Sequence, residues 1–294
     1  MNMHSDGIGY RVFTVCNTIL LILLSVLFAY PVLYVLFASL SDANKFIGHM
    51  GLLLKPLGTN LNSYRAVFQN PMILHGYGNT LFIVVVGVAL SMVLTVLCAY
   101  VLSRKELALR RAFTFYVSFT MFFGGGLIPT YLTVKQLGLN GSLWALIIPG
   151  AMSVYNMIIL RTSFEGIPES LVESAMLDGA NHLQILNRII LPLSLPVLMV
   201  IMLYYAVGMW NSWFGAMIYI RDRAKYPLQL ILREILIQND TSSMTMNVGM
   251  ADTARVSETI QYAVIVVSTA PILVIYPFVQ KFFTKGVMIG AVKG

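Results

Sequence analysis

Charge is what this sequence most lacks: only 11% of its 294 residues are Asp, Glu, Lys or Arg, whereas 58% are hydrophobic. Soluble domains carry roughly 25% charged and roughly 45 to 50% apolar residues. So small a charged fraction argues against a soluble globular protein, and so large an apolar fraction excludes an intrinsically disordered one. The composition therefore predicts an integral membrane protein.

Clusters of cysteine and histidine are also lacking. Cys16 and Cys98 each lie within an apolar run, which supplies neither a disulfide framework nor the paired thiols of a metal site. No H-E-x-x-H, G-x-S-x-G or G-x-x-x-x-G-K-[ST] motif occurs, so neither an enzyme active site nor ATP hydrolysis by this chain is predicted. The net charge of +7 comes without a basic stretch interleaved with aromatics, which disfavours nucleic-acid binding. The four histidines are scattered: His4, His49, His75 and His182.

Long apolar runs are what the sequence does contain. A helix needs about 20 residues to cross the hydrocarbon core of a membrane. The first run is too long for a cleavable signal peptide and is interpreted as a retained span. Six runs are predicted to cross: 12–40, 79–103, 112–134, 143–160, 193–220 and 260–280.

None of the six runs contains Asp, Glu, Lys or Arg. An ionisable group at mid-bilayer costs at least about 2.5 to 3.5 kcal/mol, and ion-coupled transporters accept this cost where the charge does the coupling. The absence of charged residues from the runs disfavours an ion-coupled secondary transporter. This class remains the alternative, because carbonyls and hydroxyls at broken helices also bind sodium. Glycines 124–126 and Pro149 predict bent helices that line a polar path.

The distribution of Lys and Arg predicts the orientation. The short connection between the second and third runs is basic, and the positive-inside rule places it, together with both termini, in the cytoplasm. The long connection 221–259 also carries five Lys and Arg residues, but long loops translocate with little regard to charge. The residues of the short connection are Arg104, Lys105, Arg110 and Arg111.

The connection 161–196 is predicted to form two short helices at the membrane surface. Pro168 suits the first position of a helix that ends at Gly179. Asn181, with a glutamine three residues later, has the pattern of a capping box for a second helix that runs to Pro192. Small residues and a carboxylate suit docking of a partner protein, although an amphipathic interfacial helix without a partner fits the same residue types.

The spacing in this connection resembles a known motif. Glu173 and Ala175 are followed after three residues by Gly179 and later by the run 189–192, as in the EAA loop of permease subunits from binding-protein-dependent ABC importers. Ser174 replaces the usual central alanine with an equally small residue. Further segments resemble the carbohydrate-uptake branch, typified by the small maltose permease, and within it the smaller permease of alginate importers: 124–130, 156–161, 210–214, 226–229 and 285–290.

This resemblance implies an all-α integral membrane protein with six transmembrane helices, the type I ABC importer permease fold and a cytoplasmic coupling loop over 165–192. It implies oligosaccharide import across the bacterial inner membrane together with a second homologous permease, two cytoplasmic ATPase subunits and an extracytoplasmic solute-binding protein. ATP and Mg would bind the ATPases, and this chain would hold no cofactor or metal. The residues it assigns to coupling are Glu173, Ser174, Ala175, Asp178 and Gly179, braced by Ile189, Leu191 and Pro192.

The fifth run is predicted to line a substrate path. Trp210 and Trp213 are three residues apart and so would share one helix face, and with Asn211 they offer the aromatic planes and amide that sugars bind. The same tryptophans fit an interfacial aromatic belt. Further candidates are Tyr155, Asn156, Tyr204 and Tyr205.

The connection after the fifth run is a candidate contact for the solute-binding protein or for an acidic oligosaccharide such as a uronate chain. Carboxylates in the same connection balance the charge of its basic residues, so a solvated surface explains these basic residues equally well. Its basic residues are Arg221, Arg223, Lys225 and Arg233.

Overall fold

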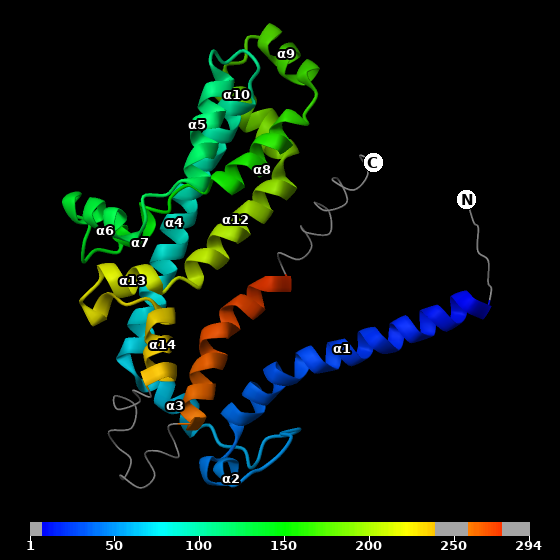
Figure 1. Ribbon diagram of the computed structural model, residues 1–294, viewed down its shortest axis with the longest axis vertical. Helices are drawn as coiled ribbons and strands as arrows, with labels where there is room; N and C mark the ends of the chain where they lie inside the picture. Colours follow the sequence, from blue (N-terminus) through cyan, green and yellow to red (C-terminus); the bar gives the residue numbers. More distant parts are fainter. Residues whose placement is uncertain (1–7, 239–257, 278–294) are drawn as a thin grey trace. The chain divides into compact units, whose positions relative to one another are not determined.

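The computed structural model describes residues 8–238 and 258–277. Over these residues the regular elements are helices, accompanied by one isolated β-bridge between Ser41 and Thr59 (Figure 1). The expected all-α architecture is therefore confirmed for the described part of the chain. The chain divides into two compact units, called here unit 1 (residues 1–70 and 234–269) and unit 2 (residues 71–233 and 270–294).

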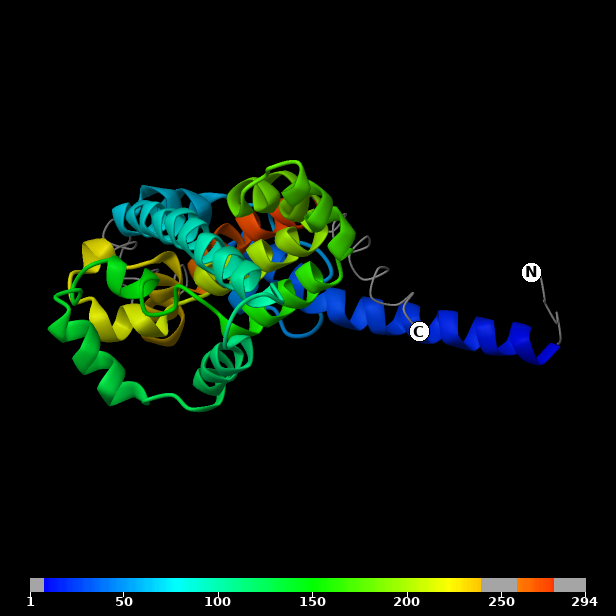
Figure 2. The ribbon, with the colours of Figure 1, turned by 90° about the horizontal axis from the view of Figure 1, so that it is seen from above.

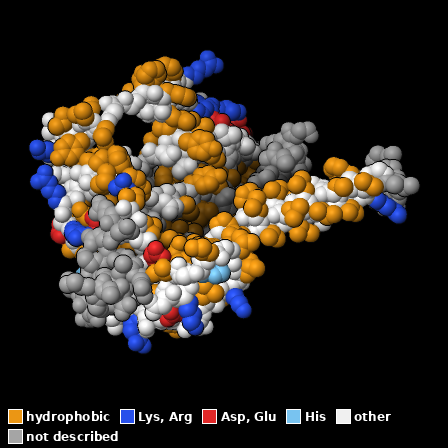
Figure 3. Space-filling view, turned by 60° about the horizontal axis from the view of Figure 1, so that its bottom comes forward, with side chains coloured by type: hydrophobic (Ala, Val, Ile, Leu, Met, Phe, Trp, Pro, Cys, Tyr) orange, Lys and Arg blue, Asp and Glu red, His pale blue; other side chains and the backbone are white. Residues whose placement is uncertain are grey.

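Unit 1 contains the long helix α1 (Ile8–Leu40), followed by α2 (Ala43–Ile47) and α3 (Asn62–Gln69). The most apolar window of α1 is 0% buried within the chain, and hydrophobic side chains cover its visible face (Figure 3). A helix that is hydrophobic all round needs lipid or protein around it. Phe46 anchors the loop after α1, because its ring packs edge-on against Tyr262 with centroids 5.5 Å apart.

Unit 2 is built around α4 (Pro71–Ser103), which packs against α8 (Val154–Glu165) and α12 (Leu195–Trp210). The packed face of α4 is made of small residues. At Gly87 an added Cβ would lie 2.6 Å from the sulfur of Met209, and Ser91, Thr95 and Ala99 recur every four residues and are all 0% exposed. Between apolar helices in lipid, small side chains permit the close backbone approach that stabilises their association.

Two groups of shorter helices complete unit 2. Figure 1 shows α9 and α10 at one end of the unit, beside the ends of α5 and α8, and shows α6, α7 and α13 toward the other end. The short helices are α5 (Arg110–Phe122), α6 (Leu127–Gln136), α7 (Trp144–Ile147), α9 (Glu169–Leu177), α10 (His182–Ile185), α11 (Leu191–Leu193), α13 (Phe214–Tyr219) and α14 (Leu228–Gln238), whose last residues belong to unit 1.

The helices that could cross a membrane differ in number from the six expected. Within the described residues three are long and apolar enough, Gly9–Leu40, Pro71–Ser103 and Glu258–Pro277, or five if each of two bent pairs counts as one span. The sixth predicted run extends to residues 278–280, which lie outside the described residues, as does the segment 285–290.

Local breaks explain the difference. The predicted run 143–160 is not one helix, because α7 ends at Ile147 and α8 begins at Val154, with Pro149 between them. The run 112–134 is split into α5 and α6, which meet at 111° (Figures 1 and 2). The split falls at glycines 124–126, and Gly126 has a φ of 82° that other residues rarely adopt.

Candidate coupling site

The helix predicted to dock a partner is α9. Glu169 occupies its first turn, directly after Pro168, where a carboxylate interacts favourably with the helix dipole. The helix is ended by Gly179, whose φ of 83° lies in the left-handed region. The N–H of Ala180 donates to the carbonyl oxygen of Ala175 at 2.9 Å, which closes a glycine cap. This cap sets the length of α9 and turns the chain toward α10.

One face of α9 is anchored and the opposite face is exposed. Val172 is 3% exposed, and it shares the core of unit 2 with the half-buried Ala175. Glu173 and Ser174 are exposed, and Leu177 is 89% exposed. A large apolar side chain held in solvent beside a carboxylate and a small residue is typical of a protein-docking surface. Asp178 and Gly179 are exposed at the end of the same helix.

The predicted capping box is formed at the start of α10. The side chain of Asn181 accepts the backbone N–H of Gln184 at 2.9 Å, and the side-chain oxygen of Gln184 accepts the backbone N–H of Asn181 at 2.8 Å. After one turn α10 widens into a π-helical turn at Leu186–Ile190. The expected single helix up to Pro192 is thus three short pieces, an irregularity that is frequent at functional sites.

The predicted bracing residues lie where this segment joins α12. Leu191 packs against the same core as α9, Ile189 is half-buried, and Pro192 is exposed. Immediately after them the chain bends by 86° between His182–Leu193 and α12. The segment therefore connects α9 to the apolar helix α12 through a packed corner.

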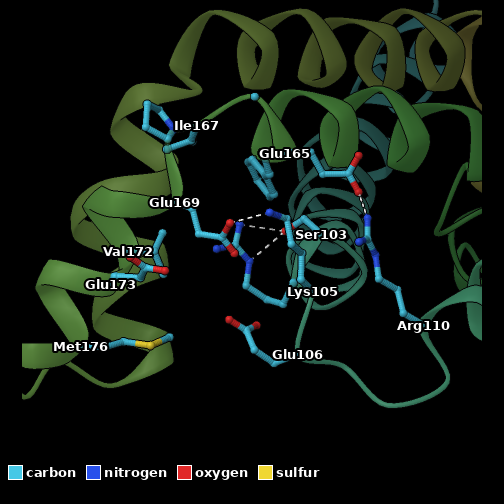
Figure 4. Close-up of a pocket in the computed structure, with 14 residues that line it drawn as sticks. Ser103, Lys105, Glu106, Arg110, Glu165, Ile167, Glu169, Val172, Glu173 and Met176 are labelled. Atoms are coloured by element: carbon cyan, nitrogen blue, oxygen red, sulfur yellow. Dashed lines mark hydrogen bonds and ion pairs between the residues drawn. The ribbon is translucent and has the colours of Figure 1, made fainter.

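A cavity of about 520 Å³ lies between α9 and the connection from α4 to α5 (Figure 4). Glu169, Glu173 and Met176 face it from α9, and the Nζ of Lys105 donates to Glu169 at 2.5 Å. This hydrogen bond and the charge of the carboxylate raise the pKa of Lys105 above its ordinary value. Lys105 therefore stays charged at neutral pH and joins α9 to the connection.

A second set of ion pairs lies just before α9. Glu165, at the end of α8, accepts hydrogen bonds from Arg161 at 2.9 Å and from Arg110 of α5. Arg161 also donates to the hydroxyl of Thr114 at 3.1 Å. The charged side chains of this set are 18 to 33% exposed, whereas that of Lys105 is 70% exposed, so solvent screens the Glu165 pairs less. They join the ends of α5 and α8 directly before the docking helix.

The two tryptophans of the predicted substrate path do not share a helix face. Helix α12 ends at Trp210, and Trp213 lies beyond it, just before α13. Trp210 is 6% exposed and packs edge-on against Tyr77, with ring centroids 6.2 Å apart. Its indole N–H has no hydrogen-bond partner among the described residues. Asn211 is exposed between them, and its side chain donates to the carbonyl oxygen of Val207 at 2.9 Å.

Trp213 is half of a cation–π pair. The guanidinium of Arg233 lies 4.1 Å from the ring centroid of Trp213, and one of its nitrogens lies 3.2 Å from the sulfur of Met217. The pair places a fixed cation beside an aromatic plane. In the sequence the two residues are 20 positions apart, and no local pattern links them.

The remaining candidates separate into buried and exposed residues. The hydroxyl of Tyr205 lies 2.7 Å from that of Thr95 and accepts the N–H of Ser153 at 2.8 Å, so it holds α12 to α4 and α8. Asn156 is 5% exposed inside the same packing. Tyr155 and Tyr204 are 55% and 45% exposed and remain available to a partner or substrate.

The contacts that the sequence did not predict are that of Tyr77 with Trp210 and the ion pairs of Glu165. Arg110 and Glu165 are separated by 55 positions, and no periodicity connects them. Composition was the one signal for the ion pairs. A basic connection and the acidic start of the segment 165–192 should attract each other, but composition does not say which residues pair.

Residues 1–289 match the family described as binding-protein-dependent transport system inner membrane component. The chain belongs to this family. Its sequence is 42% identical, over 93% of this chain and 96% of the relative, to the polygalacturonan/rhamnogalacturonan transport system permease protein YtcP of Bacillus subtilis (strain 168). Protein LplC of the same organism is 41% identical over 99% of this chain and 98% of its own length.

A solved structure supports the same assignment. The fold matches a chain of a bacterial ABC transporter involved in the import of the acidic polysaccharide alginate, with a TM-score of 0.86, 33% identity, and coverage of 96% of this chain and 100% of that chain. The expected importer-permease family and fold are therefore confirmed, and the protein is an inner-membrane component of an ABC import system.

Proposed function

We propose that this inner-membrane component forms half of the translocation path of an ABC importer for acidic oligosaccharides and receives its driving force through α9. The observation that carries the proposal is the exposed face of Glu173, Ser174 and Leu177 on a helix whose opposite face is anchored in the core. The chain has no phosphate-binding loop, so the force comes from partner ATPases.

The partners follow from this division of labour. Two cytoplasmic ATPase subunits bind ATP and Mg, one of them docked on α9; a second homologous permease completes the path; and an extracytoplasmic solute-binding protein delivers the oligosaccharide. By thermodynamic linkage, the binding protein must favour the same state of the permease pair that ATP favours. This chain itself performs no catalysis.

The orientation follows from the same site. The end of unit 2 that carries α9 lies in the cytoplasm together with both chain termini, since the basic connection beside α9 obeys the positive-inside rule. Residues 1–7 and 278–294 lie outside the described residues.

The mechanism begins at α9. A displacement of α9 by a closing ATPase passes to α5 through Glu165 and Arg110, and to α12 through the corner at Leu191. Because α5 and α6 are separate helices joined at glycines 124–126, the cytoplasmic half of that broken span can move without carrying the outer half rigidly with it. Alternating access then results from rocking of these elements against the partner permease.

The acidic character of the substrate rests on the Trp213 and Arg233 pair. Arg233 covers one face of the Trp213 ring, so a sugar ring would stack its C–H face on the opposite face while the guanidinium binds its carboxylate, and the pair fits a uronate unit in this way. Polygalacturonan and alginate, named for two relatives, are both built from uronates. Asn211, which is exposed after the end of α12, extends the path, whereas Trp210 is buried against Tyr77 and supports it from within the chain.

The transport proposal is tested by reconstitution. The chain is inserted into vesicles with and without its co-purifying permease and ATPases, and uptake of labelled oligogalacturonate is followed with ATP or with an imposed sodium or proton gradient. We expect uptake only with the full set of subunits, binding protein and ATP. Uptake by this chain with an ion gradient alone would establish the alternative, an ion-coupled secondary transporter.

Arg233→Gln tests the acidic substrate. The change keeps a polar side chain, although a shorter one, and removes the cation over Trp213. We therefore expect uptake of a uronate trimer to fall about tenfold and uptake of a neutral trimer to change less than twofold, since a charge-assisted hydrogen bond is worth about 1.5 to 3 kcal/mol. Lys135→Gln, which changes an exposed cation outside this connection, is the control. Equal losses in both variants, or with both sugars, would exclude a specific uronate contact at Trp213.

A further inference from the structure

A second cleft, of about 960 Å³, lies on the other side of the basic connection, along the start of α5. Four cationic side chains line it, together with two hydroxyls and several apolar residues, and no carboxylate is among the lining residues. The cations are Lys105, Arg110, Arg111 and Arg161.

The cleft keeps a positive charge after its ion pairs are counted. Glu165 pairs with both Arg110 and Arg161, and Glu169 pairs with Lys105, so two carboxylates face four cations. Both carboxylates line the cavity beneath α9 instead of this cleft. Within the described residues Arg111 makes no ion pair, and its side chain is exposed.

The cleft continues into an apolar track along α5. No residue of α5 is buried in the chain, and Phe115, at the cleft, is 72% exposed. The ring of Phe119 lies 6.1 Å from that of Phe115, and the ring of Phe123 stacks on Phe119 at 4.3 Å. Leu109, 73% exposed at the cleft, is the one described non-glycine residue with a positive φ, 59°. The backbone thus holds an apolar side chain outward beside the cations.

We propose that this cleft binds an anionic phospholipid, with the phosphate headgroup among Arg111 and its neighbouring cations and an acyl chain along Phe115, Phe119 and Phe123. The inference rests on the proposed orientation, which puts the cleft at the cytoplasmic membrane surface. Basic pockets between membrane helices on this side fit anionic headgroups, each cation contributing about 1 kcal/mol. An acidic protein segment would use the cations and leave the aromatic track uncovered.

The position of the cleft gives the lipid a role in coupling. Arg110 and Arg161 line the cleft and also hold Glu165, so a bound phosphate shares them with the ion pairs that join α5 to α8. The headgroup neutralises the excess positive charge of these side chains and leaves the ion pairs of Glu165 in place.

The test uses the full chain, purified in detergent and titrated with dioleoyl-phosphatidylglycerol or dioleoyl-phosphatidylcholine, with bound lipid counted by native mass spectrometry. We expect phosphatidylglycerol to bind at least fivefold more tightly than phosphatidylcholine. Arg111→Gln removes one cation and should therefore reduce this preference about fivefold. Arg188→Gln, an exposed cation outside the cleft, should keep it.

Four outcomes would overturn the proposal. Equal binding of the two lipids would show that the cleft does not select a negative headgroup. Equal loss in the Arg111 and Arg188 variants would leave only a diffuse charge effect. Competition by inorganic phosphate as effective as by lipid would mark an anion site without an acyl contact. Loss of the preference once the co-purified permease is present would show that protein covers the cleft. None of these outcomes depends on transport, so they are separable from failure of the proposed function.

Discussion

Replacing Gly179 by proline is expected to abolish import while leaving the protein in the membrane. Proline fixes φ near −65°, whereas Gly179 has a φ of 83°, and proline also removes the N–H that Gly179 donates to Met176 at 3.0 Å. The cap of α9 cannot form, and the exposed face that would meet the ATPase is lost. A penalty of about 3 kcal/mol at this turn corresponds to a loss of transport of about a hundredfold or more.

Asparagine at the same position is the matched control. It tolerates the left-handed region better than other non-glycine residues, and an added Cβ meets nothing within 4 Å at Gly179. Gly179→Asn should therefore retain most of the transport activity. ATP-driven uptake and ATP hydrolysis in proteoliposomes give the comparison, with the amount of inserted protein measured in each.

A bulky residue at Ala175 should act through the other face of the helix. Ala175 packs against the core that anchors α9, and Ala175→Trp would push the helix away from it. Import is again expected to be lost with the protein still inserted. Normal uptake with normal ATP hydrolysis in both Gly179→Pro and Ala175→Trp would remove α9 from the coupling role.

The docking segment could be predicted from the sequence because its signals are local. The glycine cap at Gly179 and the capping box at Asn181 each act within a few residues, and the structure shows both, whereas Pro168, expected at the first helical position, lies one residue earlier at the N-cap. The family was readable for the same reason, since its motif is a spacing along one segment. What could not be read was the π-helical turn at Leu186–Ile190, which has no distinctive composition.

The substrate path was predicted less well because it depends on where helices end. The periodicity that puts Trp210 and Trp213 on one face holds only inside a helix, and α12 ends at Trp210. Tyr205 reads as a candidate for sugar binding, yet its hydroxyl is used by Thr95 and Ser153 from two other helices. Contacts of this range are set by tertiary packing, which the sequence alone does not display.

Glu165→Gln is the second change with a large expected effect, a fall of about tenfold in oligosaccharide transported per ATP hydrolysed. Glutamine keeps the shape of the side chain but withdraws the charge shared by Arg110 and Arg161, so the ion pair between α5 and α8 is lost and the hydrogen bond from Arg161 to Thr114 remains. Partly exposed pairs contribute only about 1 kcal/mol each to stability, so the protein should still fold and insert. A coupling free energy of 1 to 3 kcal/mol between sites is a typical magnitude, and losing about 1.4 kcal/mol gives the tenfold change.

The exposed pair of Lys105 and Glu169 supplies the control. It distinguishes loss of the specific link between α8 and α5 from a general loss of charge. Lys105→Gln breaks a pair of the same chemistry between the neighbouring connection and α9, but its side chains are 70% and 45% exposed, so the change in transport per ATP should stay under twofold. Both variants are assayed in vesicles by counting labelled oligosaccharide and released phosphate together. Equal uncoupling by the two variants would mean that the charge of the connection matters and the specific link from α8 to α5 does not. Full coupling in Glu165→Gln would leave the corner at Leu191 as the route by which α9 moves the apolar helices.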